Sequence, residues 1–292
     1  MNILNQFDYY APKSKDEALK LKESLGDKAK VLAGGTDLII MLKEKMITTE
    51  AIIDISSLDE LKGIKCEKGK GAEIGACTTI AEINASKDLK AKFTALAYAA
   101  GELGSHQVRT AATLGGNCCH SSPAAETPSS LSAYGAKVVL SSKKGDREVA
   151  IEDFIQGNRK NALEPGEIVT KFVLPEPAPK TACRYGYIGL RGAMEIDAVN
   201  MAVNITVDGD KITDCKLVMG SVFPRPLVSQ SIPALLKGQA LTDDLIKKVG
   251  EAAQGEAKPI ADIRASAEYR HDVVGALARR LVKEAYEAAK EA

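Results

Sequence analysis

The feature that most constrains the fold is a change of hydrophobic pattern after a short proline-rich stretch. Residues 175–180 contain three prolines, which is typical of a linker between structural units. Beyond it, apolar residues alternate from Val199 to Val207, and they alternate again from Cys215 to Met219. The dipeptide Asp208-Gly209 between these runs is a hairpin signal. The pattern therefore predicts antiparallel strands in this part of the chain.

The same region contains a further strand signal over Cys183–Ile188 and two helical patterns near the end. The helices are expected over 243–253 and 265–289. A meander of strands has one hydrophobic face that must be buried, and the helices that follow the strands in the chain can pack against it. Residues 177–292 are therefore predicted to form an α+β domain, in which antiparallel strands pack with helices.

Before the linker, helix and strand signals alternate and indicate two compact units, 1–57 and 58–176. In the first unit, Ser14 and Glu17 form a capping-box pattern that opens a helix, and strands are expected over Ala29–Ala33 and Ala51–Ile55. A helix from Leu38 to about Lys45 lies between these strands in the chain.

In the second unit, a capping box at Thr79 and Glu82 and a helix over Phe93–Leu103 accompany strands over 72–76, 137–141 and 168–174. The segment Gly104–Pro128 has neither a helical nor a strand period, and we expect it to be a long functional loop. The fold class is thus α+β, with two small α/β units followed by the antiparallel domain.

Composition excludes several classes of function. Lys plus Arg and Asp plus Glu both number 39, so no overall charge attracts nucleic acid or an anionic membrane. No apolar run approaches the roughly 20 residues of a membrane span, and residues 1–15 lack the apolar core of a signal peptide. The six cysteines have no paired spacing, so we expect reduced thiols in a cytoplasmic protein and no metal site.

The first candidate site is Ala33-Gly34-Gly35-Thr36-Asp37, directly after a predicted strand. Paired glycines let the backbone turn sharply and approach a ligand with no Cβ in the way. Successive N–H groups in such a turn can bind an anion, and Thr36 adds a hydroxyl donor. A plain strand-to-helix turn is the alternative.

The second candidate is Thr113-Leu114-Gly115-Gly116-Asn117, which again sets paired glycines between a hydroxyl and an amide. Two such loops, one in each N-terminal unit, suit a ligand with two phosphates that lies in a cleft between the units. A dinucleotide with a pyrophosphate is a ligand of this kind.

These loops resemble the flavin-binding signatures of the FAD (medium) subunit of molybdenum hydroxylases, the xanthine dehydrogenase and carbon monoxide dehydrogenase group. Five further segments are similar to that family, in the same order along the chain. They are Gly104-Ser105-His106-Gln107-Val108-Arg109, Ser122-Pro123-Ala124-Ala125-Glu126-Thr127, Glu167-Ile168-Val169, Arg191-Gly192-Ala193-Met194-Glu195-Ile196 and Ser266-Ala267-Glu268-Tyr269-Arg270.

The resemblance implies a set of contacts with FAD. Glu126 stands where the family usually has Asp and should bind the ribityl chain or a neighbouring backbone group, still as a charged carboxylate. Ile168 should lie against the adenine, and Tyr187 stands near the flavin where many members have Lys. The FAD pyrophosphate should be wrapped by Lys30, Val31, Leu32, Ala33, Gly34, Gly35, Thr36 and Asp37, and the other side of the phosphate and ribityl site should be formed by Ala112, Thr113, Gly115, Gly116 and Asn117.

The resemblance also implies a role. The chain would be an oxidoreductase subunit that takes electrons from the 2Fe–2S clusters of one partner subunit and passes them to an acceptor such as NAD+. A second partner, with the molybdopterin cofactor, would hydroxylate the substrate. A purine such as xanthine is the expected substrate, with a nicotinate-like heterocycle or an aldehyde as the alternative. No side chain of this chain is expected to act as nucleophile or base. A free-standing flavoprotein oxidase or reductase, or a flavin-free nucleotide-binding module, is the competing interpretation.

Overall fold

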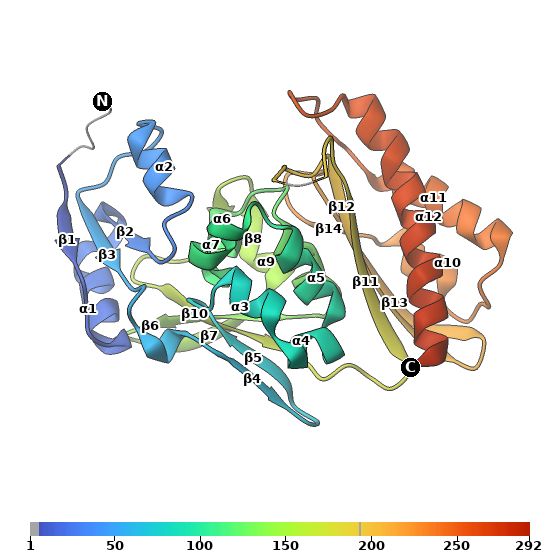
Figure 1. The fold of residues 1–292 in the computed structure, drawn as a ribbon, viewed down its shortest axis with the longest axis horizontal. Helices are drawn as coiled ribbons and strands as arrows, with labels where there is room; N and C mark the ends of the chain where they lie inside the picture. The colour runs from blue at the N-terminus through green and yellow to red at the C-terminus, as the bar shows by residue number, and fades with distance from the viewer. Residues whose placement is uncertain (1–5, 193) are drawn as a thin grey trace.

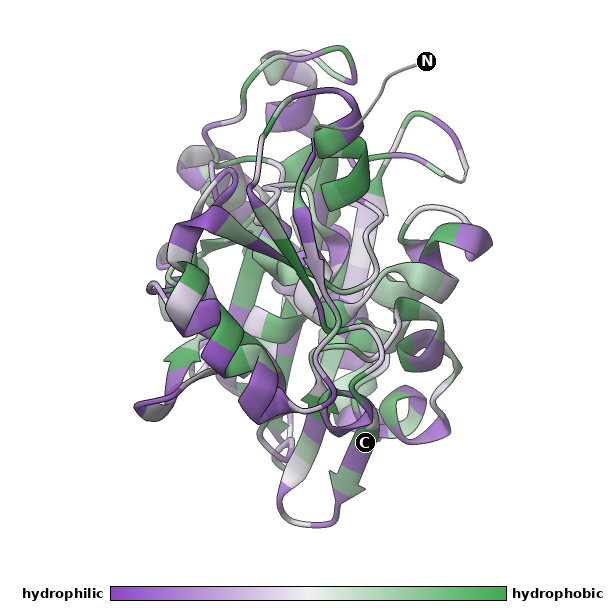
Figure 2. Cartoon of the chain, turned by 90° about the vertical axis from the view of Figure 1, so that its left-hand side faces the viewer, coloured by the Kyte–Doolittle hydropathy of each residue, from purple (hydrophilic) through white to green (hydrophobic). Residues whose placement is uncertain are grey.

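The computed structural model describes residues 6–192 and 194–292. Figure 1 shows three parts in chain order: a small sheet with its helices, a larger sheet covered by helices, and a third sheet with the C-terminal helices on its far face. In Figure 2, the strands at the centre of the molecule are largely hydrophobic, whereas the peripheral helices alternate hydrophobic and hydrophilic residues. None of the described helices is both long enough and apolar enough to cross a membrane.

The first part is a parallel sheet of order β1-β3-β2. Both predicted strands are confirmed, and β1 is an addition that the sequence pattern did not indicate. Ser14 caps α1 as predicted, but the capping box is incomplete because the Glu17 carboxylate accepts from Lys13 N at 2.7 Å rather than from Ser14. The elements are β1 (Asp8–Tyr10), α1 (Lys15–Leu25), β2 (Ala29–Leu32), α2 (Leu38–Lys43) and β3 (Ala51–Asp54), with short 3-10 turns at Gly26–Lys28 and Asp59–Leu61.

The second part is a five-stranded sheet of order β4-β5-β10-β6-β7 in which every neighbouring pair is antiparallel. The capping box at Thr79 and Glu82 is confirmed. The strands are β4 (Ile64–Glu67), β5 (Gly71–Gly75), β6 (Lys137–Ser142), β7 (Gly145–Ala150) and β10 (Ile168–Leu174), with a small hairpin of β8 (Ile155–Gly157) and β9 (Lys160–Asn161). The first helices are α3 (Ile80–Ala85), α4 (Lys87–Lys92), α5 (Thr94–Glu102) and α9 (Ile151–Phe154).

The prediction that Gly104–Pro128 is a loop without regular structure was wrong. The segment contains α6 (His106–Ala111), α7 (Leu114–His120) and the start of α8 (Glu126–Ala133). Ser105 and Thr113 cap the first two helices. All eight residues of α8 are buried, so this helix has no solvent-exposed face and shows no amphipathic period.

The third part confirms the predicted hairpin and both long helices. Its sheet has the order β11-β12-β13-β14 and is antiparallel throughout. Helices α5 and α8 pack on one face, and α12 packs on β11 and β12 from the other. The elements are β11 (Thr181–Ile188), β12 (Val199–Asp208), β13 (Lys211–Gly220), β14 (Leu227–Val228), α10 (Ser231–Leu236), α11 (Asp243–Glu256) and α12 (Ala267–Glu291).

Candidate functional site

A cleft of about 860 Å³ contains both glycine loops. This volume is in the upper range of ligand and cofactor pockets. Every predicted site residue except Leu32 and Tyr187 lines it. The lining residues from the prediction are Lys30, Val31, Ala33, Gly34, Gly35, Thr36, Asp37, Ala112, Thr113, Gly115, Gly116, Asn117, Glu126 and Ile168.

Leu32 and Tyr187 lie outside the cleft lining. A Cβ on Gly35 would lie 3.0 Å from Leu32 Cδ1, so the Leu32 side chain packs against the glycine turn. The Tyr187 hydroxyl donates to Glu102 Oε2 at 2.8 Å, and its ring lines a second cavity of about 430 Å³ beside α12. Tyr187 is therefore not part of the cleft lining, and its place near the flavin stays a prediction.

The first glycine loop passes directly over the end of α6. A Cβ on Gly34 would lie 2.0 Å from the Ala111 carbonyl oxygen, and Gly35 has φ +73°. Both positions therefore require glycine, one for close approach and the other for its backbone conformation. Within the described residues, the backbone N–H groups of 34–38 donate to no protein acceptor, and bonding resumes with Ile39 N to Gly35 O at 3.1 Å. The loop thus offers a run of free donors toward the cleft.

The second glycine loop works differently. Gly115 N donates to Ala76 O at 2.8 Å, and Gly116 N donates to Thr113 Oγ1 at 3.1 Å. A Cβ on Gly115 would lie 2.8 Å from the same Ala76 oxygen. These glycines therefore serve close packing of α7 against β5, and their amides are already paired. The two loops face each other, since His120 Nε2 at the end of α7 lies 3.9 Å from Asp37 Oδ1.

Glu126 is the most perturbed acid of the cleft. Burial, together with the neighbouring Asp197 carboxylate, raises the pKa of Glu126 to about 8. Burial also raises the pKa of Asp197 to about 7, although Tyr185 donates to its Oδ2 at 3.1 Å. Glu126 is therefore largely protonated at neutral pH, which corrects the sequence-based expectation of a charged carboxylate. In that form its carboxyl can donate a hydrogen bond.

Several charged or polar residues that line the cleft were not predicted from the sequence. Arg159, Lys160 and Asn161 come from the β8–β9 turn, and Lys22 comes from α1. Arg159 has φ +57°, and Asn161 Nδ2 donates to Cys119 O at 2.9 Å, so this turn is fastened to α7. The turn dipeptide Gly157-Asn158 was the available signal.

Glu167 also lines the cleft, and the sequence pointed to it only as part of a family-like segment. Arg147 donates to its two carboxylate oxygens at 2.6 and 2.8 Å. Burial alone would raise the pKa of Glu167, but the hydrogen bonds from Arg147 and from Glu164 N, together with the charge of Arg147, outweigh it and lower that pKa. The paired carboxylate also accepts from Glu164 N at 2.7 Å, and it thereby fixes the chain just before Ile168.

Residues between β11 and β12 also contribute to the lining of the cleft. Glu195 and Ile196 line the cleft, whereas Leu190 and Met194 are exposed. Glu195 Oε2 accepts from Arg191 N at 2.7 Å. Ala193, which belongs to a family-like segment, lies outside the described residues.

Comparisons with known proteins identify the class. Residues 5–177 match the FAD binding domain in molybdopterin dehydrogenase, and residues 187–285 match the CO dehydrogenase flavoprotein C-terminal domain. The chain is 32% identical to the carbon monoxide dehydrogenase medium chain of Afipia carboxidovorans, over 99% of both chains. It is 33% identical to the glyceraldehyde dehydrogenase medium chain of Sulfolobus acidocaldarius, over 96% of this chain and 98% of that one.

The structural comparison agrees. A chain in the crystal structure of the cyanide-inactivated Cu,Mo-CO dehydrogenase superposes with a TM-score of 0.93 at 31% identity, covering 98% of this chain and 99% of that one. The chain therefore belongs to the FAD-binding (medium) subunits of molybdenum hydroxylases, as the resemblance implied, and is part of an oxidoreductase.

Proposed function

We propose that this chain is the electron-transfer subunit of a molybdenum hydroxylase complex. In this role it receives electrons from the 2Fe–2S clusters of one partner and delivers them to NAD+, while a molybdenum-cofactor partner hydroxylates the substrate. FAD, when bound, supplies the chemistry that joins one-electron donors to a two-electron acceptor. The observation that carries the proposal is the single cleft in which the free amides of one glycine loop face the other glycine loop.

Different residues of the cleft would bind different parts of FAD. The N–H groups of 34–38 donate to the pyrophosphate oxygens, because oriented amides with no protein acceptor bind an anion without reorganisation. Ala112, Thr113 and Asn117 line the facing wall, and Ile168, which lines the same cleft, would hold the adenine. The protonated carboxyl of Glu126 donates to a cofactor oxygen from a buried position. Lys30, Val31, Ala33, Gly115 and Gly116 complete the cleft.

The substrate is a separate matter, because the molybdenum subunit selects it. The two relatives named above act on carbon monoxide and on glyceraldehyde by name. The purine that the sequence suggests stays a prediction for the assembled complex, as does NAD+ as the acceptor.

The test is to purify the chain from its host with its partner subunits and to identify the released chromophore. We expect FAD, iron–sulfur absorbance and two further polypeptides. After anaerobic reduction, addition of NAD+ should reoxidise the complex and yield NADH. A flavin-containing chain without partners would instead favour a free-standing flavoprotein. A colourless chain that cannot take up FAD would refute the proposal, and a complex that reduces a dye but not NAD+ would refute the acceptor.

A further inference from the structure

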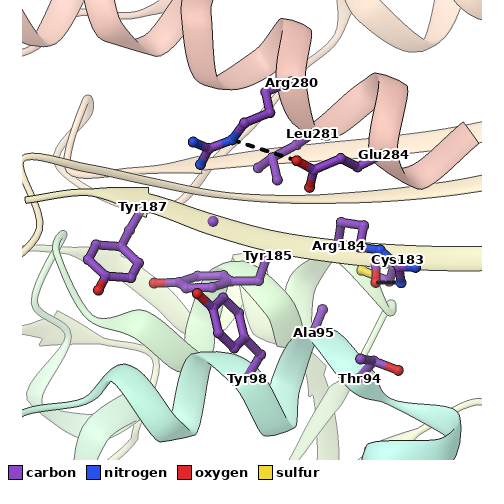
Figure 3. A pocket seen from close by; sticks show the side chains of 11 residues that line it. Thr94, Ala95, Tyr98, Cys183, Arg184, Tyr185, Tyr187, Arg280, Leu281 and Glu284 are labelled. Carbon is purple, nitrogen blue, oxygen red and sulfur yellow. Dashed lines mark hydrogen bonds and ion pairs between the residues drawn. The ribbon is translucent and has the colours of Figure 1, made fainter. Parts of the chain in front are cut away.

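Strand β11 lies at an open edge of the third sheet. It pairs with β12 along its whole length, from Thr181 to Ile188, and among the described residues no strand lies on its other side. That side faces the cavity of about 430 Å³ which Tyr187 lines. Figure 3 shows this groove, with α5 below β11 and α12 above it.

The hydrogen bonds of β11 reveal which backbone groups face the groove. Val207 N donates to Lys180 O at 3.0 Å. Since backbone groups alternate along an antiparallel strand, even-numbered residues of β11 bond to β12 and odd-numbered residues point to the groove. Within the part of the chain that the structure describes, the N–H groups of Cys183, Tyr185 and Tyr187 reach no protein acceptor. Of their carbonyls, that of Cys183 accepts from Arg184 Nη1 at 3.3 Å.

The edge strands β1, β4, β7 and β14 are protected against pairing, and β11 is not. Three of the six residues of β7 are charged, as are two of the four residues of β4. Strands β1 and β14 have only three and two residues. By contrast, β11 has eight residues with a single charge, Arg184. Short strands and charged side chains are the usual protection of free edges, so an unprotected long edge indicates a surface that is covered in the functional assembly.

The groove walls match an extended peptide. On the α5 side, Tyr98 is 48% exposed and its ring lies 6.1 Å from that of Tyr185. On the α12 side, a Cβ on Gly186 would lie 3.1 Å from Arg280 Nη2, so no β11 side chain separates Arg280 from the groove. Two arginines, Arg184 and Arg280, line the groove with only one carboxylate, that of Glu284, whose Oε1 lies 3.9 Å from Arg280 Nε. The groove is therefore aromatic on one side and positive on the other.

We infer that β11 is extended by strand addition, in which an extended segment of a partner subunit pairs with its free edge. Side chains of an added strand alternate between the two faces. The segment should therefore place a carboxylate toward Arg184 and Arg280 and an apolar side chain against Tyr98. This inference rests on the proposed function, because it assigns the occupant to a subunit of the complex.

Residue-resolved hydrogen exchange tests the pairing. The complex with its molybdenum-cofactor and iron–sulfur subunits is compared with the isolated full chain. We expect the amides of Cys183, Tyr185 and Tyr187 to exchange at least about tenfold more slowly in the complex. The amides of Arg184 and Gly186 are already paired with β12 and serve as internal controls that stay slow in both samples.

The outcomes separate the two proposals. A complex that forms while the odd-numbered amides exchange as in the isolated chain would refute strand addition and leave the proposed function intact. Failure to form any complex would refute both. Protection that grows with the concentration of the isolated chain and is unchanged by the partners would mean that a second copy occupies the edge, and it would overturn the assignment to a partner.

A charge reversal provides an independent test. In R184E/R280E the groove becomes negative, and we expect dissociation of the complex to increase at least about tenfold. K237E/K247E changes the net charge equally at exposed positions outside the groove and should leave dissociation unchanged. Equal dissociation of both variants would contradict the inference, provided that R184E/R280E retains its FAD and its folded spectrum.

Discussion

Substitution of Gly34 by alanine tests the contact between the first glycine loop and α6. The new Cβ would lie 2.0 Å from the Ala111 carbonyl oxygen and 2.7 Å from its carbon. Both are backbone atoms, so no side chain can rotate away. The loop must move by more than 1 Å to reach an ordinary separation of about 3.2 Å. Overpacking of this kind costs about 1–3 kcal/mol.

The same movement separates the free amides of 34–38 from the facing wall of the cleft. We expect G34A to lose at least about tenfold in FAD affinity, since hydrogen-bond donors displaced by 1 Å no longer fit the same anion. The measurements are fluorescence titration of the apoprotein with FAD and urea unfolding of the same preparations.

Gly255→Ala is the matched control. Gly255 lies in α11, and a Cβ there meets nothing within 4 Å. This variant should bind FAD normally and gain up to about 1 kcal/mol, because alanine is the better helix former. If G34A binds FAD as tightly as G255A does and unfolds at the same urea concentration, a Cβ at position 34 does not displace the loop from α6.

Three further predictions concern buried polar groups. Because the pKa of Glu126 rises from 4.5 to about 8 on folding, the unfolding free energy should fall as pH rises between these values. Between low pH and pH 7, this group should lower the unfolding free energy by about 3 kcal/mol. Urea titrations of E126Q at several pH values should not show this decrease. A pH dependence equal to that of the wild type would contradict the assignment. Arg270 donates to Ala198 O, Ser221 O and Asp262. Its replacement by methionine should lower the free energy of unfolding by about 2–4 kcal/mol. The exposed Arg280→Met should cost under about 0.5 kcal/mol in the same urea assay. A thiol reagent at pH 8 should label half-buried Cys66 before buried Cys77, because burial raises the pKa of the Cys77 thiol to about 12 and shields it. Mass spectrometry of the labelled peptides would show the reversed order if this is wrong.

The elements that sequence analysis predicted best are those with one buried face. Strand β12 and helix α12 each bury a regular side of their surface, so their apolar residues recur at periods of two and 3.6. The first turn of helix α8 was missed because the whole helix is buried against β12, β13 and neighbouring helices and shows no amphipathic period. Charged β7 was missed for the opposite reason, since an edge strand in solvent has little apolar pattern. The unit boundaries at 57 and 176 stay predictions.

The candidate site divides in the same way. Gly34 and Gly35 were recognisable in the sequence because only glycine suits both positions. Gly34 approaches the Ala111 backbone too closely for a Cβ, and Gly35 has a positive φ. The sequence alone therefore determined the glycine loops, the strand-rich C-terminal part and the family. Only the tertiary structure decided the protonation of Glu126, the place of Tyr187 and the open edge of β11. Each of these depends on segments that are distant in the sequence: Glu126 is buried beside Asp197, Tyr187 donates to Glu102, and β11 pairs with β12 on one side only.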